Sequence, residues 1–457
     1  MAELELTRFV RNARANLRRR MARRPVAFVL SGGGSQGSFE VGVLRYLYDD
    51  LGLRPSILVG SSVGAIMAAK LAEGDDEATG RRAIDELEAI WRGLRSNHDM
   101  WLTEPWLDKL RMQVNWASEL RGRAGEHGTA GSQARVVMRM LGEIVRNPPE
   151  TDGTVDALRG ALKAKSLLSM VPVRAIVERR LSPELMQASG LTLRVGAVSL
   201  ESGELRYVDQ HGRLHARDDT LLPGEPVSVH DAVLASASIP VVFPPTPMAG
   251  EHYVDGGVRE ILPLALAFNG LGAGHIFAVV ASAPGVDPWG DASDRGLFEI
   301  ARRVTADIGP DETLRKEINP PRGWGRRVTV IVPEVDVHDA LTIDAELIAA
   351  SIDYGYMRAA DVLLDLDEDQ CALSTEIART RVRIREARGP IPGLLQVDPA
   401  ATIAQPEVEA KELATLAVLV ARRREAGAPL PPGACGLDPE EFGAPVVERS
   451  GLEPPAD

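Results

Sequence analysis

The chain has 457 residues, a formal net charge of −13 at pH 7, and 44% hydrophobic and 26% charged residues, as in ordinary globular proteins. Its apolar runs fall short of the ~18 residues that a membrane helix needs, and an acidic chain is a poor non-specific binder of nucleic acid. Two cysteines exclude a disulfide scaffold and a four-cysteine zinc site. No run of seven apolar residues lies near the N-terminus, so we expect no secretory signal and a cytoplasmic location.

Residues 1–24 form a basic arm with eight arginines and two glutamates, a local charge of +6. Apolar residues recur in this arm at three- and four-residue spacing, which predicts an amphipathic helix. Such a helix suits peripheral contact with an anionic membrane surface. A solvated or oligomer-packing arm and a cleavable organelle-targeting segment are the alternatives, and an oligomer is left open.

Two strand–turn–helix units follow the arm. Val26–Leu30 is an apolar strand that leads through a Gly/Ser segment into a helix ending at about Asp50. Ser56–Val59 is a second apolar strand, followed by another Gly/Ser turn and the helix Ala65–Glu73. Two such units within 50 residues predict an α/β fold with a parallel sheet.

The rest of the chain alternates between helical and strand patterns. Residues 75–190 are predicted to be a mostly helical insertion, whose tryptophans either form a lid or lipid-facing wall or pack in the core. The sheet is expected to resume at 191–199, 204–209, 252–254, 276–282 and 328–333, with a helix at 343–364. We therefore predict a catalytic domain over 25–370 and a C-terminal extension over 371–457, disordered from about 425.

The segment Gly60-Ser61-Ser62-Val63-Gly64 fits the pattern G-x-S-x-G between a strand and a helix. In that pattern the serine is a nucleophile on a strained turn, and glycines flank it because side chains would clash there. The helix N-terminus places a positive dipole near Ser62. A Gly/Ser turn without chemistry is the alternative.

A glycine-rich segment, Gly32-Gly33-Gly34-Ser35-Gln36-Gly37, joins the first strand to its helix. A dinucleotide fingerprint would need an acidic residue at the end of the next strand, where the sequence has Ser61 and Ser62. Consecutive glycines beside a helix N-terminus can instead form an oxyanion hole from backbone N–H groups. A simple packing turn is the third alternative.

A nucleophilic serine needs a base. Of the eight histidines only His338 lies late enough for a Ser–Asp–His order, and a solvated loop histidine is its alternative role. Tyr253-Val254-Asp255-Gly256-Gly257 offers an aspartate at the end of a short strand, although an Asp-Gly turn would give the same pattern.

Taken in order, these three motifs resemble the patatin-like phospholipase family, which pairs G-G-G-x-[RK]-G with G-x-S-x-G and a later D-G-[GA]. The resemblance extends to Ala235–Pro240, Phe243–Pro245 and Leu262–Leu264 and covers roughly residues 25–365. Gln36 departs from the family pattern, because it stands where Arg or Lys is usual and supplies no charge.

The resemblance implies a three-layer α/β/α fold with a mainly parallel sheet. It further implies that Ser62 attacks a lipid ester, that Asp255 takes the serine proton directly, and that Gly32, Gly33 and Gly34 form the oxyanion hole. Gly37, Gly60, Gly64, Gly256 and Gly257 would support these turns. No cofactor, metal or calcium is implied, and the substrate would be phospholipid or a related acyl ester at a membrane surface. A non-enzymatic or activator-dependent effector, a Ser–His–Asp esterase and a nucleotide-dependent oxidoreductase are the alternatives.

Overall fold

The computed structural model describes residues 25–106, 164–286, 303–319, 321–391 and 404–432, with a few isolated positions between 287 and 302. The basic arm, residues 107–163 of the predicted insertion and the tail beyond 432 therefore lie outside the described residues. Within the described residues, no helix combines the length and the apolarity that a membrane crossing needs.

A nine-stranded sheet forms the centre of the molecule, with the order β11-β10-β1-β2-β5-β6-β7. Its first five strands run parallel, and the later strands β6 and β7 continue antiparallel. A further hairpin, β8–β9, pairs with the end of β5 through β9. The strands are β1 (Val26–Leu30), β2 (Ile57–Ser61), β5 (Thr192–Ser199), β6 (Leu205–Val208), β7 (Leu214–His215), β8 (Thr246–Met248), β9 (Glu251–Asp255), β10 (His275–Val279) and β11 (Val328–Ile331).

Both faces of the sheet are buried, as the continuous apolar runs of β1 and β2 require. Phe28 and Leu30 pack into the larger core cluster, whereas Ala27 and Val29 pack into a second cluster on the opposite face. This division follows from the alternation of side chains along a strand. The three-layer α/β/α arrangement with a mainly parallel sheet is therefore confirmed.

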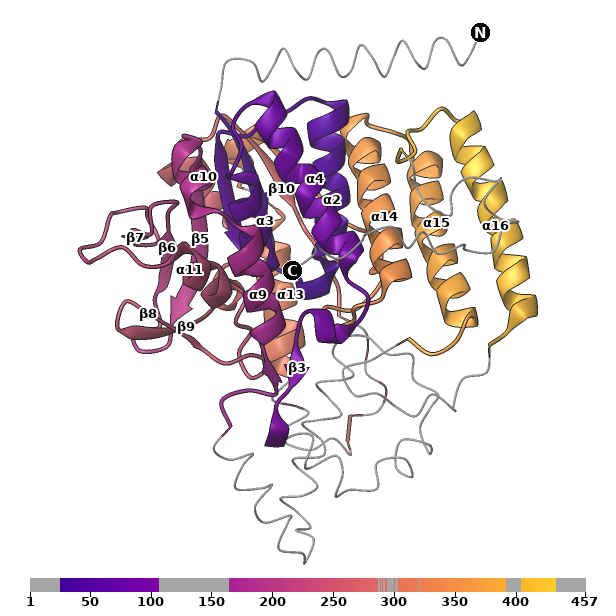
Figure 1. Ribbon diagram of the computed structural model, residues 1–457. Helices are drawn as coiled ribbons and strands as arrows, with labels where there is room; N and C mark the ends of the chain where they lie inside the picture. Colours follow the sequence, from indigo (N-terminus) through magenta and orange to yellow (C-terminus); the bar gives the residue numbers. More distant parts are fainter. Residues whose placement is uncertain are drawn as a thin grey trace, which may run out of the picture.

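The helices form two unequal layers (Figure 1). The larger core lies under α2 (Gly37–Arg45), α3 (Val63–Leu71), α4 (Glu77–Gly93), α11 (Val229–Ser236) and α14 (Ala345–Leu363). The smaller core includes Leu314 of α13 (Gly309–Glu317) and the π-helical turn Leu266–Gly270. Two short helices, α9 (Val171–Arg180) and α10 (Pro183–Ala188), precede β5.

The C-terminal region adds a row of helices beside α14, namely α15 (Glu368–Ala387) and α16 (Pro406–Glu425) (Figure 1). The domain boundary that we predicted after residue 370 falls inside α15. The fully buried ion pair of Asp361 with Arg423 joins α14 to α16, and its N–O distance is 2.8 Å. α16 ends at the residue where the disordered tail was predicted to begin.

Three of the tryptophans from the predicted insertion lie in the described part of the chain. Trp91 and Trp101 are 4% and 5% exposed, so they belong to the core rather than to a lipid-facing surface. Trp106 is half-buried, and its indole N–H donates to the Ser166 carbonyl at 3.1 Å. Trp116 lies outside the described residues.

Candidate active site

Ser62 lies on a strained turn between β2 and α3. Its backbone has φ 54° and ψ −129°, a conformation that a non-glycine residue seldom adopts without a compensating function. The flanking glycines are required by close backbone contact: a Cβ at Gly60 would lie 2.3 Å from the Gly64 carbonyl oxygen, and one at Gly64 would lie 2.4 Å from that of Ser31. This geometry is that of a nucleophile elbow.

A second serine holds the elbow in place. The Ser62 N–H donates to Ser236 Oγ at 3.0 Å, and the Ser236 hydroxyl donates to the Gly196 carbonyl at 2.5 Å. Ser236 belongs to α11 and Gly196 to β5, so the elbow is tied to the helix and the strand beside it. From the sequence, Ser236 was noted only as part of a family motif, and no role was predicted for it.

Asp255 ends β9, which pairs antiparallel with β5 so that Asp255 faces Ala197. β2 pairs with the other edge of β5, and this common neighbour brings Asp255 and Ser62 together from positions 193 residues apart in the chain. The Asp255 N–H donates to the Ser238 carbonyl at 3.0 Å. The Asp255 carboxylate accepts a hydrogen bond from the Ser62 side chain and another from the Gly257 N–H at 2.7 Å.

Burial controls the proton affinity of this carboxylate. Asp255 is 5% exposed, and its burial raises its pKa from an ordinary value near 4 to about 6, against the lowering effect of the Ser62 and Gly257 hydrogen bonds. Both of these hydrogen-bond donors are neutral. Asp255 is therefore a stronger base than a solvated aspartate, while most of it stays ionised at neutral pH.

The glycine-rich segment packs directly against Ser62. A Cβ at Gly32 would lie 2.7 Å from the Ser62 Cβ, so only glycine fits there. Gly34 has φ +57°, and a Cβ on it would lie 2.2 Å from the Ala340 carbonyl oxygen. Among the hydrogen bonds of the described residues, the N–H groups of Gly33 and Gly34 donate to no acceptor. The segment therefore presents free amide donors near the elbow.

The remaining glycines of the predicted set serve close packing. A Cβ at Gly37 would lie 2.9 Å from Val63, the residue after the elbow, and one at Gly256 would lie 2.5 Å from the Gly196 carbonyl oxygen. Gln36, the departure from the family pattern, is 8% exposed, and its N–H donates to the Gly33 carbonyl at 3.1 Å.

A buried glutamate anchors the start of the glycine-rich segment, and our sequence analysis did not single it out. Glu40 of α2 is fully buried, and its Oε1 accepts the N–H and the hydroxyl of Ser31 at 2.9 and 3.2 Å. The Ser31 Oγ in turn accepts the Ala281 N–H at 2.9 Å. Burial holds the Glu40 pKa well above its ordinary value. The role of Glu40 was difficult to predict from the sequence, because one acidic residue in an apolar helix does not identify its hydrogen-bond partner.

The two histidines considered for a triad have other contacts. His338 is buried rather than solvated: its ring lies 3.1 Å from Ser38 Oγ, and it also contacts Ser35. Burial lowers the His338 pKa to about 4, so the ring is neutral and connects a late loop to the start of α2. His252 is exposed and its ring lies 2.8 Å from Glu201. Within the described chain, neither histidine has a hydrogen bond to Ser62.

Comparisons with known proteins identify the family of this chain. A model of the family "Patatin-like phospholipase" matches residues 28–268, while a search of curated proteins found no match. Similar solved structures include VipD from Legionella pneumophila, with 16% identity, a TM-score of 0.34, and coverage of 88% of this chain and 77% of that one. Human GIVD cytosolic phospholipase A2 has 12% identity, a TM-score of 0.36, and coverage of 83% and 67%.

A third similar structure is the type III effector protein ExoU of Pseudomonas aeruginosa, with 15% identity, a TM-score of 0.26, and coverage of 91% of this chain and 73% of that one. At these TM-scores the likeness identifies no substrate. The family model, by contrast, spans more than half of the chain and includes the glycine-rich segment, the elbow and Asp255. This match supports a lipid hydrolase activity. The chain therefore belongs to the patatin-like phospholipase family.

Proposed function

We propose that this protein is a lipid acyl hydrolase that uses a Ser62–Asp255 dyad to release fatty acid from phospholipid or a related acyl ester. The observation that carries the proposal is the hydrogen-bonded Ser62–Asp255 pair on a strained elbow. A serine hydroxyl hydrogen-bonded to a base is the arrangement that nucleophilic catalysis needs. The family membership supplies the class of substrate.

In the first half of the reaction, Ser62 Oγ attacks the ester carbonyl while its proton passes to Asp255. The tetrahedral oxyanion accepts hydrogen bonds from the free N–H groups of Gly33 and Gly34. Asp255 then returns the proton to the departing alcohol oxygen, and the acyl group stays on Ser62. In the second half, Asp255 removes a proton from water, which attacks the acyl-enzyme. The bond from the acyl carbon to Ser62 Oγ then breaks, Asp255 returns the proton to Ser62 Oγ, and the fatty acid is freed.

The raised pKa of Asp255 supports a base that works without histidine. An aspartate near pKa 4 is a poor base for an alcohol, and burial moves Asp255 to about 6. The contacts of His338 and His252 lie elsewhere, which disfavours the Ser–His–Asp alternative. Replacing each histidine with glutamine separates the two mechanisms, since a triad would lose activity through one of these changes.

The test is fatty acid release from mixed phospholipid vesicles by the wild type, Ser62→Ala and Ser236→Ala. We expect release by the wild type, none by Ser62→Ala, and a reduced rate for Ser236→Ala, which loosens the elbow but keeps the nucleophile. A fluorophosphonate probe should label the wild type and not Ser62→Ala. A labelled protein without turnover would point to a missing activator, and an unlabelled wild type would favour a non-enzymatic effector.

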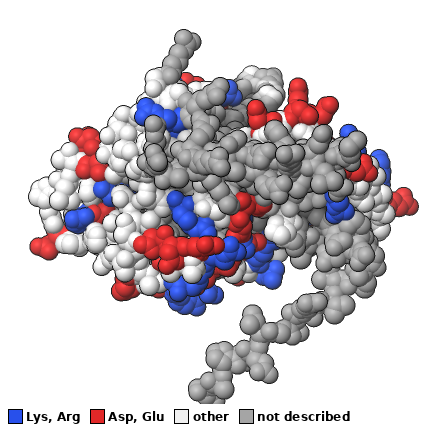
Figure 2. All heavy atoms as spheres, turned by 90° about the horizontal axis from the view of Figure 1, so that it is seen from above, with Lys and Arg blue, Asp and Glu red and all other residues white. Residues whose placement is uncertain are grey.

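The distribution of charge on the surface bears on how the protein would meet a membrane. On the face that Figure 2 shows, acidic and basic side chains lie intermixed and none of the described elements forms a basic patch. We propose that the basic arm, residues 1–24, supplies the attraction to anionic lipid. Deleting residues 2–24 should weaken binding to anionic vesicles and leave binding to neutral vesicles as it was. Equal binding to anionic vesicles with and without the arm would refute its role.

A further inference from the structure

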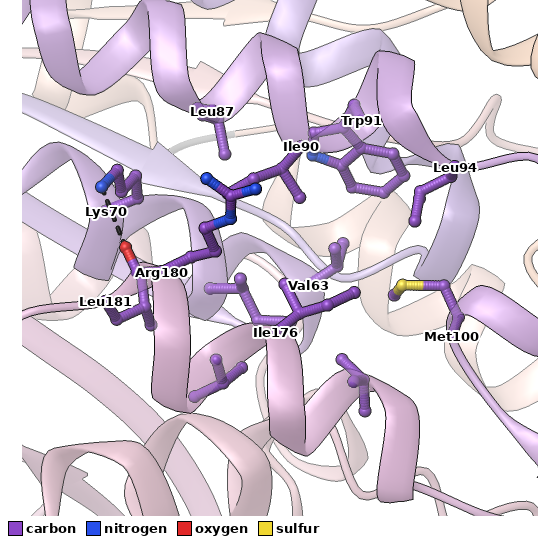
Figure 3. Close-up of a pocket in the computed structure, with 13 residues that line it drawn as sticks. Val63, Lys70, Leu87, Ile90, Trp91, Leu94, Met100, Ile176, Arg180 and Leu181 are labelled. Carbon is purple, nitrogen blue, oxygen red and sulfur yellow. Dashed lines mark hydrogen bonds between the residues drawn. The ribbon is translucent and has the colours of Figure 1, made fainter. Parts of the chain in front are cut away.

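Ser61, the residue before the proposed nucleophile, points to the face of the sheet that carries the smaller core. Along β2 it alternates in phase with Val59, which packs into that core together with Leu262 of the loop after Asp255. The apolar cavity drawn in Figure 3 lies in the larger core on the other face, has a volume of about 30 Å³, and is lined by neither Ser62 nor Asp255. Ser61 and the loop that follows the proposed base therefore share one face of the sheet.

A direct hydrogen bond joins Ser61 to this loop. Ser61 is 1% exposed, and its hydroxyl donates to the Glu260 carbonyl at 3.1 Å. A Cβ at Gly256 would lie 2.8 Å from the same hydroxyl oxygen, so the Ser61 side chain also packs closely against the start of the loop. Because Ser61 and Glu260 are 199 positions apart in the chain, this bond connects the elbow to the segment that carries Asp255.

Between Asp255 and Glu260 the chain forms one tight turn. The N–H groups of Arg259 and Glu260 both donate to the Gly256 carbonyl at 3.0 Å. The Gly257 N–H, inside the turn, is the donor that the Asp255 carboxylate accepts at 2.7 Å. A turn closed by these bonds moves as one unit, so a displacement of Glu260 also displaces the Gly257 donor that orients the Asp255 carboxylate.

The Glu260 side chain is held from a different direction. It is buried, its Oε2 accepts the Tyr207 hydroxyl at 2.6 Å, and its Oε1 accepts Arg217 Nε at 2.7 Å. Tyr207 is fully buried in β6 and faces Gly196 of β5, where a Cβ would lie 3.1 Å from the Tyr207 ring. The Gly196 carbonyl also accepts the Ser236 hydroxyl that fixes the elbow. Tyr207 therefore ties Glu260 to the part of the sheet that holds the nucleophile.

A second carboxylate holds the two residues after Glu260. Oε2 of Glu317, at the end of α13, accepts the Ile261 N–H at 3.1 Å and the Leu262 N–H at 2.8 Å. Main-chain or side-chain groups of three successive residues are thus bonded to β2, β6 and α13. Such a set of bonds leaves the loop little freedom to move relative to the elbow.

We propose that Glu260 is a positioning residue, which holds the Asp255 carboxylate at the Ser62 hydroxyl through the tight turn and the bond to Ser61. The inference rests on the proposed function. A proton passes from Ser62 to Asp255 only at hydrogen-bond distance, and a misplacement of about 1 Å can lower a rate about 10²-fold. Because the pair acts in the chemical steps, misplacing it lowers kcat and leaves KM nearly unchanged.

The test compares Glu260→Ala and Glu260→Gln with the wild type in two measurements. One is the rate at which a fluorophosphonate labels Ser62, and the other is kcat and KM for p-nitrophenyl butyrate. Glu260→Ala removes the acceptor of the Tyr207 hydroxyl, so we expect the labelling rate and kcat to fall together by about 10- to 100-fold with KM unchanged. Glu260→Gln keeps that acceptor, and the half-exposed Arg217 can turn to solvent, so most of the loss should be recovered.

Two tyrosines provide a matched pair of variants. Tyr207→Phe removes the hydroxyl that holds Glu260 and should lower the labelling rate several-fold. Tyr253→Phe is the control: Tyr253 is also buried and donates to a glutamate, Glu251, at 2.9 Å, but this bond lies outside the loop. The labelling rate and kcat of Tyr253→Phe should equal those of the wild type.

A labelled wild type whose rate is unchanged in Glu260→Ala and Tyr207→Phe would overturn the positioning role and leave the proposed function intact. Equal losses in the two tyrosine variants, or a loss that Glu260→Gln does not recover, would also overturn it. Thermal unfolding shows whether Glu260→Ala folds, and if it does not, Tyr207→Phe decides. A folded wild type that is neither labelled nor active would refute the proposed function itself, and the positioning role with it.

Discussion

Two buried aspartates show how the same side chain serves different purposes in the two halves of the molecule. Among the described residues, Asp255, at the sheet, accepts hydrogen bonds only from neutral groups, the Ser62 hydroxyl and the Gly257 N–H. Asp361, in the C-terminal helical layer, accepts from the Arg423 guanidinium at 2.8 Å and from Ser374 Oγ at 2.5 Å. Burial raises the pKa of both carboxyl groups, but only Asp361 has a cation beside it, which opposes that rise and makes the pair a structural link between two helices.

This difference extends to the surrounding backbone. The elbow at Ser62 is strained, and the glycine-rich segment beside it keeps amide donors free. In the C-terminal layer, by contrast, the donors of the buried Arg423 are paired: its guanidinium also donates to the Ser374 hydroxyl at 2.6 Å and to the Pro429 carbonyl at 3.0 Å. A strained backbone and free amide donors therefore lie side by side at the proposed active site, where reaction chemistry can use them.

Asp255→Asn should give the largest effect. An asparagine keeps the shape but cannot take a proton, so we expect kcat/KM to fall by about 10²–10⁴-fold, the usual range for a lost general base. The free energy of unfolding at pH 8 should stay equal or rise, because the change removes a buried charge. Fatty acid release measures the fall in kcat/KM, and urea denaturation measures the free energy of unfolding. A large loss of stability in Asp255→Asn would contradict the contrast drawn between Asp255 and Asp361.

The matched change in the C-terminal helical layer is Asp361→Asn. It leaves the Arg423 guanidinium buried without its counter-ion, and such a loss typically costs about 3–5 kcal/mol of the free energy of unfolding. Urea denaturation measures this loss. At urea concentrations below the unfolding transition, kcat should stay near the wild-type value. The double variant Asp361→Leu/Arg423→Met should recover most of the stability, and a double variant as unstable as the single one would contradict the ion-pair explanation.

Gly32→Ala tests the backbone beside the nucleophile. The new Cβ would lie 2.7 Å from the Ser62 Cβ and must displace either the elbow or the glycine-rich segment. Such a displacement moves the proposed oxyanion donors of Gly33 and Gly34 relative to Ser62, and losing one such donor costs about 10²–10³ in kcat, so we expect a fall of that size. Gly93→Ala is the control, since a Cβ there meets nothing within 4 Å, and its kcat should be that of the wild type.

The pH profile gives the smallest and most specific effect. Because burial raises the pKa of Asp255 to about 6, the carboxyl is protonated below that pH and cannot accept the Ser62 proton. The value of kcat/KM should fall about tenfold per pH unit below 6 and level off above it. The same shift means that ionising Asp255 costs stability between about pH 4 and 6. A profile with its midpoint near 4 would contradict the buried base.

The local elements of the sheet could be predicted from the sequence. The strands β1, β2, β5 and β9 and the helix α14 lie where the apolar patterns placed them, because burial on both faces leaves a continuous apolar run. The turn at Ser62 was also predictable, since the glycines at positions 60 and 64 are dictated by backbone contact within the turn itself.

The contacts that hold the site together could not be predicted in the same way. Ser236 is 174 residues from Ser62, and His338 is 300 residues from Ser38. The burial of His338 and the contacts of Glu40 depend on which elements pack against one another. No pattern of spacing along the chain reports that packing.

The sequence by itself determined the turns, because glycine geometry and strand burial act over a few neighbouring residues. It also determined the family, because the motifs keep a fixed order. Only the tertiary structure decided the environment of each group: that Asp255 is buried beside neutral donors, that Asp361 has a cation, and that Trp91 is buried in the core. The physical reason is that proton affinity and packing depend on every atom nearby, and those atoms come from all parts of the chain.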